Sequence, residues 1–359
     1  MGAFDRLTDW YKARRCERRR VAICDALDDA LKGAPSRPVP GKDRVIIFSD
    51  HHKGARDGAD DFQRCERGYN AALAYYNRLG YHLIELGDVE ELWENSFEEV
   101  ASNYPRTLEL AAEFQRADRY TRFWGNHDLA WSDAELFQEH MTVHGYSAVV
   151  PIEALRLLLH DEAGRPVGAL FLVHGHQGTA DSDRHAKRSR FLVRHGWRRL
   201  QRHLNRPWNT PSVDWALRGE HAAHMASWAS SRDQVLVAGH THLPVFFHAQ
   251  KEPAMTPDQA ITPADEPDDS RAEALELGWS EWAEAETVRL GLQKPIPLAS
   301  PCYFNTGCCS FGDGDITGIE ISDGTIRLVR WPCVPKPVPE KLAELRLDEV
   351  FPHRPQDRT

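Results

Sequence analysis

Residues 45–52 read VIIFSDHH, a run of four apolar residues that stops abruptly at a serine, an aspartate and two histidines. Such a run predicts a buried β-strand with polar residues at its carboxyl end. The rhythm recurs at 81–86, which ends in Gly87-Asp88, at 120–124, which ends in Gly125-Asn126, and at 234–238, which ends in Gly239-His240. In layered α/β proteins, sites form where strands end. The sequence therefore predicts an α/β core with a polar site along one edge.

Two antiparallel hairpins accompany these strands. Segments 157–160 and 167–173 flank a turn at 161–164, and segments 316–321 and 325–330 flank Ser322-Asp323-Gly324. An Asp-Gly pair between alternating apolar runs is a hairpin signal. Hairpins beside β-α-β units predict a mixed sheet, or two sheets packed together.

Three kinds of segment interrupt the strands and helices of the core. The helical pattern of 1–32 carries five arginines between residues 14 and 20 and is followed by prolines at 35, 38 and 40, which indicate a boundary. We therefore expect a cationic N-terminal helix and linker over 1–40 and a core domain over 41–331. Within the core we expect a helical cap insertion at about 180–230 and an acidic loop insertion at about 251–298. A Pro-rich tail covers 332–359.

Composition narrows the class of protein. The net charge of −10 over 359 residues argues against nucleic acid as the partner. No apolar run approaches the roughly 18 residues that span a bilayer, and residues 1–32 lack the apolar stretch of a secretion signal. Seven cysteines without a CxxC pair indicate reduced thiols. We expect a cytoplasmic protein.

Five short motifs carry the candidate chemistry. Each follows or ends a predicted strand, and together they supply aspartate, asparagine and histidine donors, which suit divalent metals. They are Asp50-His51-His52, Gly87-Asp88, Gly125-Asn126-His127-Asp128, His174-Gly175-His176 and Gly239-His240-Thr241-His242. A single motif of this kind is more often an ordinary loop, but five at strand ends indicate one shared site.

The ordered set Asp-x-His, Gly-Asp, Gly-Asn-His-Asp, His and Gly-His-x-His resembles the calcineurin-like metallophosphoesterase superfamily over roughly residues 44–331. The resemblance implies a four-layer α-β-β-α sandwich of two mixed sheets, here with an inserted helical cap. It also implies that Asp50, His52, Asp88 and His242 hold one metal ion. Asn126, His174 and His240 would hold a second ion, with Asp88 bridging the two.

The same resemblance implies the reaction. A metal-bridging hydroxide would attack phosphorus in a phosphate ester or pyrophosphate, and the cofactors would be two divalent or mixed-valence ions. Manganese or iron is expected, with zinc or magnesium as alternatives. His127 would stabilise the transition state or protonate the leaving group, oriented by Asp128. His176 and His160 are rivals to His174 as ligand. His51 is expected to be structural or to contact a ligand without binding metal itself.

The segment 184–206 contains no acidic residue and several arginines beside an apolar stripe. It fits either an anionic membrane or phosphate surface, or a solvated helix packed on the core. Its position after His174, together with the stretch GDVEELW at 87–93, resembles the bacterial UDP-2,3-diacylglucosamine pyrophosphatases. We therefore expect a phosphorylated small-molecule or lipid substrate. The alternatives are a membrane-peripheral pyrophosphatase acting on a UDP-linked lipid and a non-catalytic binding scaffold on the same fold.

Overall fold

The computed structural model describes residues 3–147, 149–179, 215–246, 302–333 and 337–352. Their strands form two six-stranded sheets, ordered β1-β5-β6-β7-β9-β8 and β12-β11-β10-β2-β3-β4. The strands are β1 Ser36–Val39, β2 Val45–Phe48, β3 His82–Leu86, β4 Tyr120–Phe123, β5 Ala154–His160, β6 Pro166–Val173, β7 Val235–Ala238, β8 Pro244–Phe246, β9 Tyr303–Thr306, β10 Ile316–Ser322, β11 Thr325–Trp331 and β12 Glu340–Arg346.

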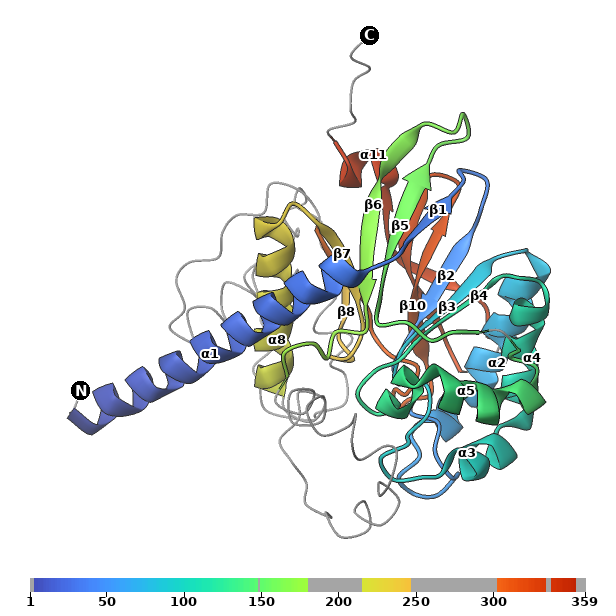
Figure 1. The fold of residues 1–359 in the computed structure, drawn as a ribbon, viewed down its shortest axis with the longest axis horizontal. Helices are drawn as coiled ribbons and strands as arrows, with labels where there is room; N and C mark the ends of the chain where they lie inside the picture. The colour runs from blue at the N-terminus through green and yellow to red at the C-terminus, as the bar shows by residue number, and fades with distance from the viewer. Residues whose placement is uncertain (1–2, 148, 180–214, 247–301, 334–336, 353–359) are drawn as a thin grey trace, which may run out of the picture.

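Helices cover the outer faces of both sheets. Figure 1 shows α1 and α8 on one side of the strands and α2, α4 and α5 on the other. The helices are α1 Ala3–Gly33, α2 Phe62–Arg78, α3 Phe97–Asn103, α4 Pro105–Arg116, α5 Ala134–Met141, α8 Trp215–Ser231 and α11 Leu347–Val350, with 3₁₀ turns at Leu129–Ser132 and Thr142–His144.

Three hydrophobic cores separate the four layers, and the strand residues alternate between them. In β2, Val45 and Ile47 point into the core between the sheets, while Ile46 and Phe48 point into the core under α2 and α4. In β6, Leu170 and Leu172 share the central core, and Phe171 packs under α8. Because both faces of these strands are buried, their sequences are continuous apolar runs. Each apolar run ends where the strand ends, because the residues that follow are no longer covered on both faces.

The predicted fold class is confirmed. Strand β2 has the expected bounds, and both hairpins form as the antiparallel pairs β5–β6 and β10–β11. Parallel pairs join β2 to β3, β3 to β4 and β6 to β7, so both sheets are mixed. The carboxyl ends of β2, β3, β4, β6 and β7 consequently meet at one end of the sandwich.

The expected domain boundaries are wrong at both ends of the core. The presumed linker before residue 41 contains β1, which pairs in parallel with β5 at a sheet edge, where a proline such as Pro38 is tolerated. The presumed tail after residue 331 contains β12, which pairs with β11. The last third of the expected cap is α8, which packs on β7 and β9 in the helical layer.

The rest of the expected cap and the acidic insertion at 251–298 lie outside the described residues, as does the basic segment 184–206. Among the residues that the structure describes, no helix is long and apolar enough to cross a membrane.

Candidate metal centre

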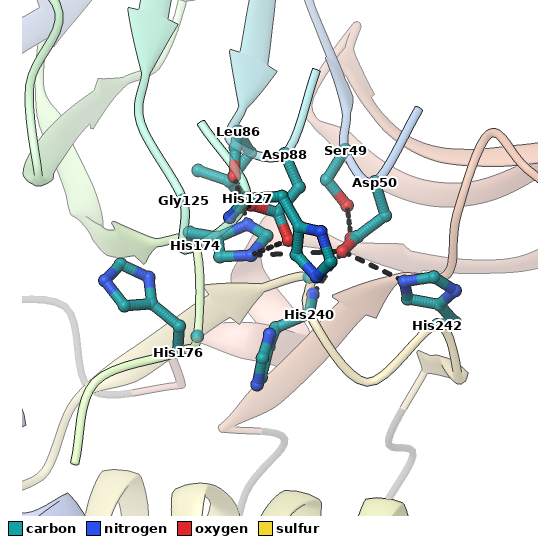
Figure 2. A network of polar contacts seen from close by, with 12 residues as sticks. Ser49, Asp50, Leu86, Asp88, Gly125, His127, His174, His176, His240 and His242 are labelled. Carbon is teal, nitrogen blue, oxygen red and sulfur yellow. Dashed lines mark hydrogen bonds and ion pairs between the residues drawn. The ribbon is translucent and has the colours of Figure 1, made fainter. Parts of the chain in front are cut away.

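The seven predicted ligands come from both sheets. Asp50, Asp88 and Asn126 follow β2, β3 and β4 of one sheet, and His52 lies two residues beyond Asp50. His174 and His240 follow β6 and β7 of the other sheet, and His242 lies two residues beyond His240. Figure 2 shows the Asp50 carboxylate between the rings of His174 and His242.

The donor atoms form three overlapping groups. Asp50, His52 and His242 have ligand atoms within 4.8 Å of one another, as do Asp88, His174 and His240. The third group is His52, Asp88 and His127. His52 Nε2 lies 3.9 Å from Asp50 Oδ1 and 3.9 Å from Asp88 Oδ2, so it connects the groups. His174 Nε2 is 3.0 Å from Asp88 Oδ2. Six of the seven predicted ligands, all but Asn126, belong to these groups.

The backbone at the site is unusual. Nine described non-glycine residues have positive φ, and five of them are predicted ligands: Asp50, His52, Asp88, His240 and His242, with φ between +50° and +67°. The left-handed conformation costs a non-glycine residue on the order of 1 kcal/mol or more and concentrates at functional sites. Five strained residues in one place indicate that these loops are shaped to direct their side chains into the site, at the expense of local stability.

Buried polar atoms at the site lack ordinary partners. Within the described part of the chain, Asp50 Oδ1, Asn126 Oδ1 and His240 Nε2 have no hydrogen-bond partner. Asp50 Oδ1 instead faces imidazole nitrogens of His242, His52 and His174 at 3.4, 3.9 and 3.9 Å. Buried polar groups are normally hydrogen-bonded, so these orphaned oxygens and nitrogens are the arrangement expected of metal ligands.

Electrostatics supports the same reading. Burial alone would raise the pKa of Asp50 and of Asp88, but neighbouring histidines hold both below the usual range, and Asp88 well below it. Burial would lower the pKa of His174, yet the two carboxylates raise it to about 9. A cation entering here would replace that proton, as when imidazoles bind metals. Burial, reinforced by His174, lowers the pKa of His240 and keeps it a neutral donor.

Hydrogen bonds outside the cluster fix the ring of His174. Its Nδ1 lies 2.8 Å from the Leu86 carbonyl oxygen, so Nδ1–H donates and Nε2 is left for a ligand. The Asp50 carboxylate is held through Oδ2, which accepts from the His240 backbone N–H at 2.9 Å and from the Ser49 hydroxyl.

His127 is oriented by Glu91, and the expectation that Asp128 orients it is wrong. Glu91 Oε2 lies 2.6 Å from His127 Nδ1 and 3.2 Å from His52 Nδ1, so one carboxylate serves two rings. The indole of Trp93 stacks on the His127 ring, with centroids 3.9 Å apart and planes 21° apart, and its Nε1–H donates to the Asn126 carbonyl at 2.7 Å. Sequence reasoning missed both roles, although Glu91 follows Asp88 by only three residues.

Asp128 supports the loops from below. Its carboxylate accepts backbone N–H groups of Gly125, Asp88 and Val89 at 2.6, 3.2 and 2.9 Å. It also pairs with Arg122 at 2.7 Å, deep under the site. One side chain therefore ties together the loops that follow β3 and β4, which explains a carboxylate at this position without a role in orienting His127.

Three other histidines considered from the sequence, His51, His176 and His160, lie outside these donor groups. His51 is buried against the rings of Tyr69 and Phe62, at 4.5 and 6.0 Å. His176 is buried 5.4 Å from the ring of His174, and Figure 2 shows it to one side of Asp50 and Asp88. His160 ends β5, which runs antiparallel to β6, and lines a cavity of about 230 Å³ at the other end of the sandwich.

No protein-family model and no curated protein matches the chain. Solved structures that align with it include a predicted phosphoesterase from Streptococcus pneumoniae, at 11% identity and TM-score 0.30 over 84% of this chain and 98% of that one. Vacuolar protein sorting 29 from Cryptosporidium parvum aligns at 14% identity and TM-score 0.34, over 85% and 98%. A cold-active protein-tyrosine phosphatase from a psychrophilic Shewanella aligns at 10% and 0.37, over 85% and 82%. At these values none of the three assigns a family or an activity.

Proposed function

We propose that this chain is a metal-dependent phosphoesterase that hydrolyses a phosphate ester or pyrophosphate with two bound metal ions. The convergence of seven oxygen and nitrogen donors from two sheets, beside the hydrogen-bonded pair of His127 and Glu91, carries this proposal. Buried donor atoms without hydrogen-bond partners fit metal ligands. His127 beside them could act as the acid that hydrolysis requires.

The donor set fits two divalent cations. Asp50, His52 and His242 would hold one, His174 and His240 the other, and Asp88 would bridge them. Asn126, whose buried Oδ1 has no described hydrogen-bond partner, would complete the second set. Oxygen and imidazole donors suit manganese and iron, and also zinc. When bound, such a pair of cations supplies an activated water and neutralises the charge of the phosphoryl oxygens.

His127 is the proposed general acid. With Nδ1 bonded to Glu91, the Nε2 nitrogen is free to give a proton to the leaving oxygen. Burial lowers the pKa of His127, but Glu91 and Asp88 raise it to about 9 in the metal-free chain. Trp93 keeps the ring from rotating away by stacking on its face.

Substrate is expected to enter from one side. The side chains of His52, His127 and His242 are 13%, 15% and 16% exposed, whereas Asp50, Asp88 and His174 are at most 2% exposed. Solvent therefore reaches the site past these three histidines. A phosphorylated small molecule or lipid headgroup would place its phosphate there.

The test is hydrolysis by metal-stripped, full-length protein supplied with Mn²⁺, Fe²⁺, Zn²⁺ or Mg²⁺ in turn. The substrates are p-nitrophenyl phosphate, bis-(p-nitrophenyl) phosphate and a UDP-linked lipid. We expect metal-dependent cleavage that Asp88→Asn abolishes together with metal content. His127→Ala should lose at least about 100-fold in kcat while keeping its metal, since general acids contribute roughly 10²–10⁴-fold.

His160→Ala is the matched control, because His160 lies at the opposite end of the sandwich and should leave the rate unchanged. Metal loss in His127→Ala would show that the ring is a ligand and not the acid. Stoichiometric metal with no cleavage of any of the three substrates would favour the non-catalytic scaffold and overturn the proposal.

A further inference from the structure

A second group of metal-type donors lies between α1 and α8, away from the centre described above. Cys16 comes from α1, and Glu220 and His224 come from α8, where a spacing of four residues puts both on one helix face. The three residues are 4%, 3% and 4% exposed. Their donor atoms all lie within 4.8 Å of one another.

The distances within this group match tetrahedral zinc. Cys16 Sγ lies 3.6 Å from His224 Nε2, which lies 3.4 Å from Glu220 Oε1. With zinc bonds of about 2.3 Å to sulfur and about 2.0–2.1 Å to nitrogen or oxygen, tetrahedral angles separate sulfur and nitrogen by about 3.6 Å and nitrogen and oxygen by about 3.3 Å. Two of the three donor separations therefore match those around a zinc ion, and the third, from Cys16 Sγ to the Glu220 carboxylate, is within 4.8 Å.

The positively charged side chain of Arg19 contacts this group through Glu220. Its Nε and Nη2 each donate to the Glu220 carboxylate at 2.6 Å, which leaves the group without a net negative charge. Ligating carboxylates are commonly hydrogen-bonded in this way by a neighbouring side chain. The competing interpretation is a plain hydrogen-bonded cluster: burial, followed by Glu220, raises the pKa of the Cys16 thiol to about 12 and keeps its proton without an ion.

We propose that Cys16, Glu220 and His224 bind a divalent ion of the zinc type, with a fourth position open to water or another ligand. Binding would release the thiol proton of Cys16 to solvent, as is usual for cysteine ligands. This ion would join α1 to α8. Its donors are separate from those of the candidate phosphoesterase centre.

A joint at this position has a structural purpose. Further along α1, the backbone of Ile23 packs directly against Gly178. A Cβ atom at position 178 would lie only 2.5 Å from it. Gly178 follows His174 by four residues and has φ +74°. Fixing α1 on α8 therefore also fixes the loop that begins at His174.

The test uses Co²⁺ as a spectroscopic probe in the metal-stripped, full-length chain. Thiolate bound to Co²⁺ gives a charge-transfer absorption in the near ultraviolet. The described donors of the candidate catalytic centre contain no sulfur, so that centre cannot give this band. We expect wild type to show the band, Cys16→Ser to lose it, and Cys16→Ser to hold one zinc ion per chain fewer than wild type.

Two thiols serve as controls. Cys24 is half-buried on the same helix, and Cys308 is buried near Asp50, so Cys24→Ser and Cys308→Ala should both keep the band. His224→Gln keeps the thiol and should weaken Co²⁺ binding about tenfold or more. Absence of the band in wild type, or its survival in Cys16→Ser, would overturn the proposal. If Cys16→Ser fails to fold, weakened Co²⁺ binding in His224→Gln is the deciding result, because that variant keeps every thiol, and unchanged binding would overturn the proposal.

Discussion

Replacing Arg122 by methionine should be among the most damaging single changes outside the ligands. Arg122 is 1% exposed and pairs with Glu85, Glu90 and Asp128 at 3.1, 2.5 and 2.7 Å. Lys53 remains near Glu85 and Glu90, at 3.8 Å from each, but Asp128 keeps only backbone donors among its described hydrogen bonds. Removing one partner of a buried ion pair costs about 3–5 kcal/mol, because the other charge stays buried.

The loss should depend on pH in a defined direction. Burial raises the pKa of Glu85, but Lys53 and Arg122 lower it to about 2, against an ordinary value of 4.5. A depressed carboxyl pKa stabilises the fold above the ordinary value, and this contribution disappears as pH falls toward the folded value. The difference between wild type and Arg122→Met should therefore be largest near neutral pH and shrink below about pH 4.5.

The assay is urea unfolding at pH 7 and pH 4, together with metal affinity at pH 7. Because Asp128 holds the loops of Asp88 and Gly125, we expect metal affinity to fall about 10–100-fold as well. Arg327→Met is the control, since Arg327 is 20% exposed and its ion pairs with Glu320 and Glu344 should contribute about 0–1 kcal/mol. A loss below about 1 kcal/mol for Arg122→Met, or equal losses at both pH values, would refute the reasoning.

Three further outcomes are expected. Gly125→Ala should lower metal content, measured by atomic emission, because its Cβ would lie 2.2 Å from Asp88 Oδ1, whereas Gly58→Ala meets nothing within 4 Å and should keep its metal. His82 has its pKa lowered to about 3 by burial and by Arg37, so unfolding free energy should fall as pH drops below 6.5, by up to about 1.4 kcal/mol per pH unit, and His82→Gln should flatten that slope in urea titrations. Chelation should lower the melting temperature, because ions at about 1,000 times their Kd stabilise the folded state by roughly 4 kcal/mol; an unchanged temperature would count against a metal held by both sheets.

Much of the fold could be predicted because its strands are buried on both faces. Such strands are uninterrupted apolar runs, so the end of each run located β2 and the residues that follow it. The candidate ligands could be located for the same reason, since Asp50, Asp88 and Asn126 lie just after the runs stop. These three residues all come from one sheet. The second sheet contributes its donors through the antiparallel hairpin of β5 and β6, which ends next to His174.

The errors arise where local sequence is a poor guide to pairing. Strand β1 contains Pro38, which reads as a linker unless its place at a sheet edge is known. Strand β12, with the sequence EKLAELR, has only one buried residue, Leu345, so it lacks the apolar run that marks a strand. The assignment of Asp128 failed because adjacency in sequence was taken for adjacency of side chains, while the turn after Asn126 points His127 toward Glu91.

The distribution of ligands along the chain also sets an order in time. The donors run from residue 50 to residue 242, and β10, which borders β2, begins only at Ile316. A chain leaving the ribosome exposes the donors of one sheet long before those of the other. If the proposed centre binds metal, its donor set is therefore complete only after residue 242 has been made, because His240 and His242 belong to two of its groups.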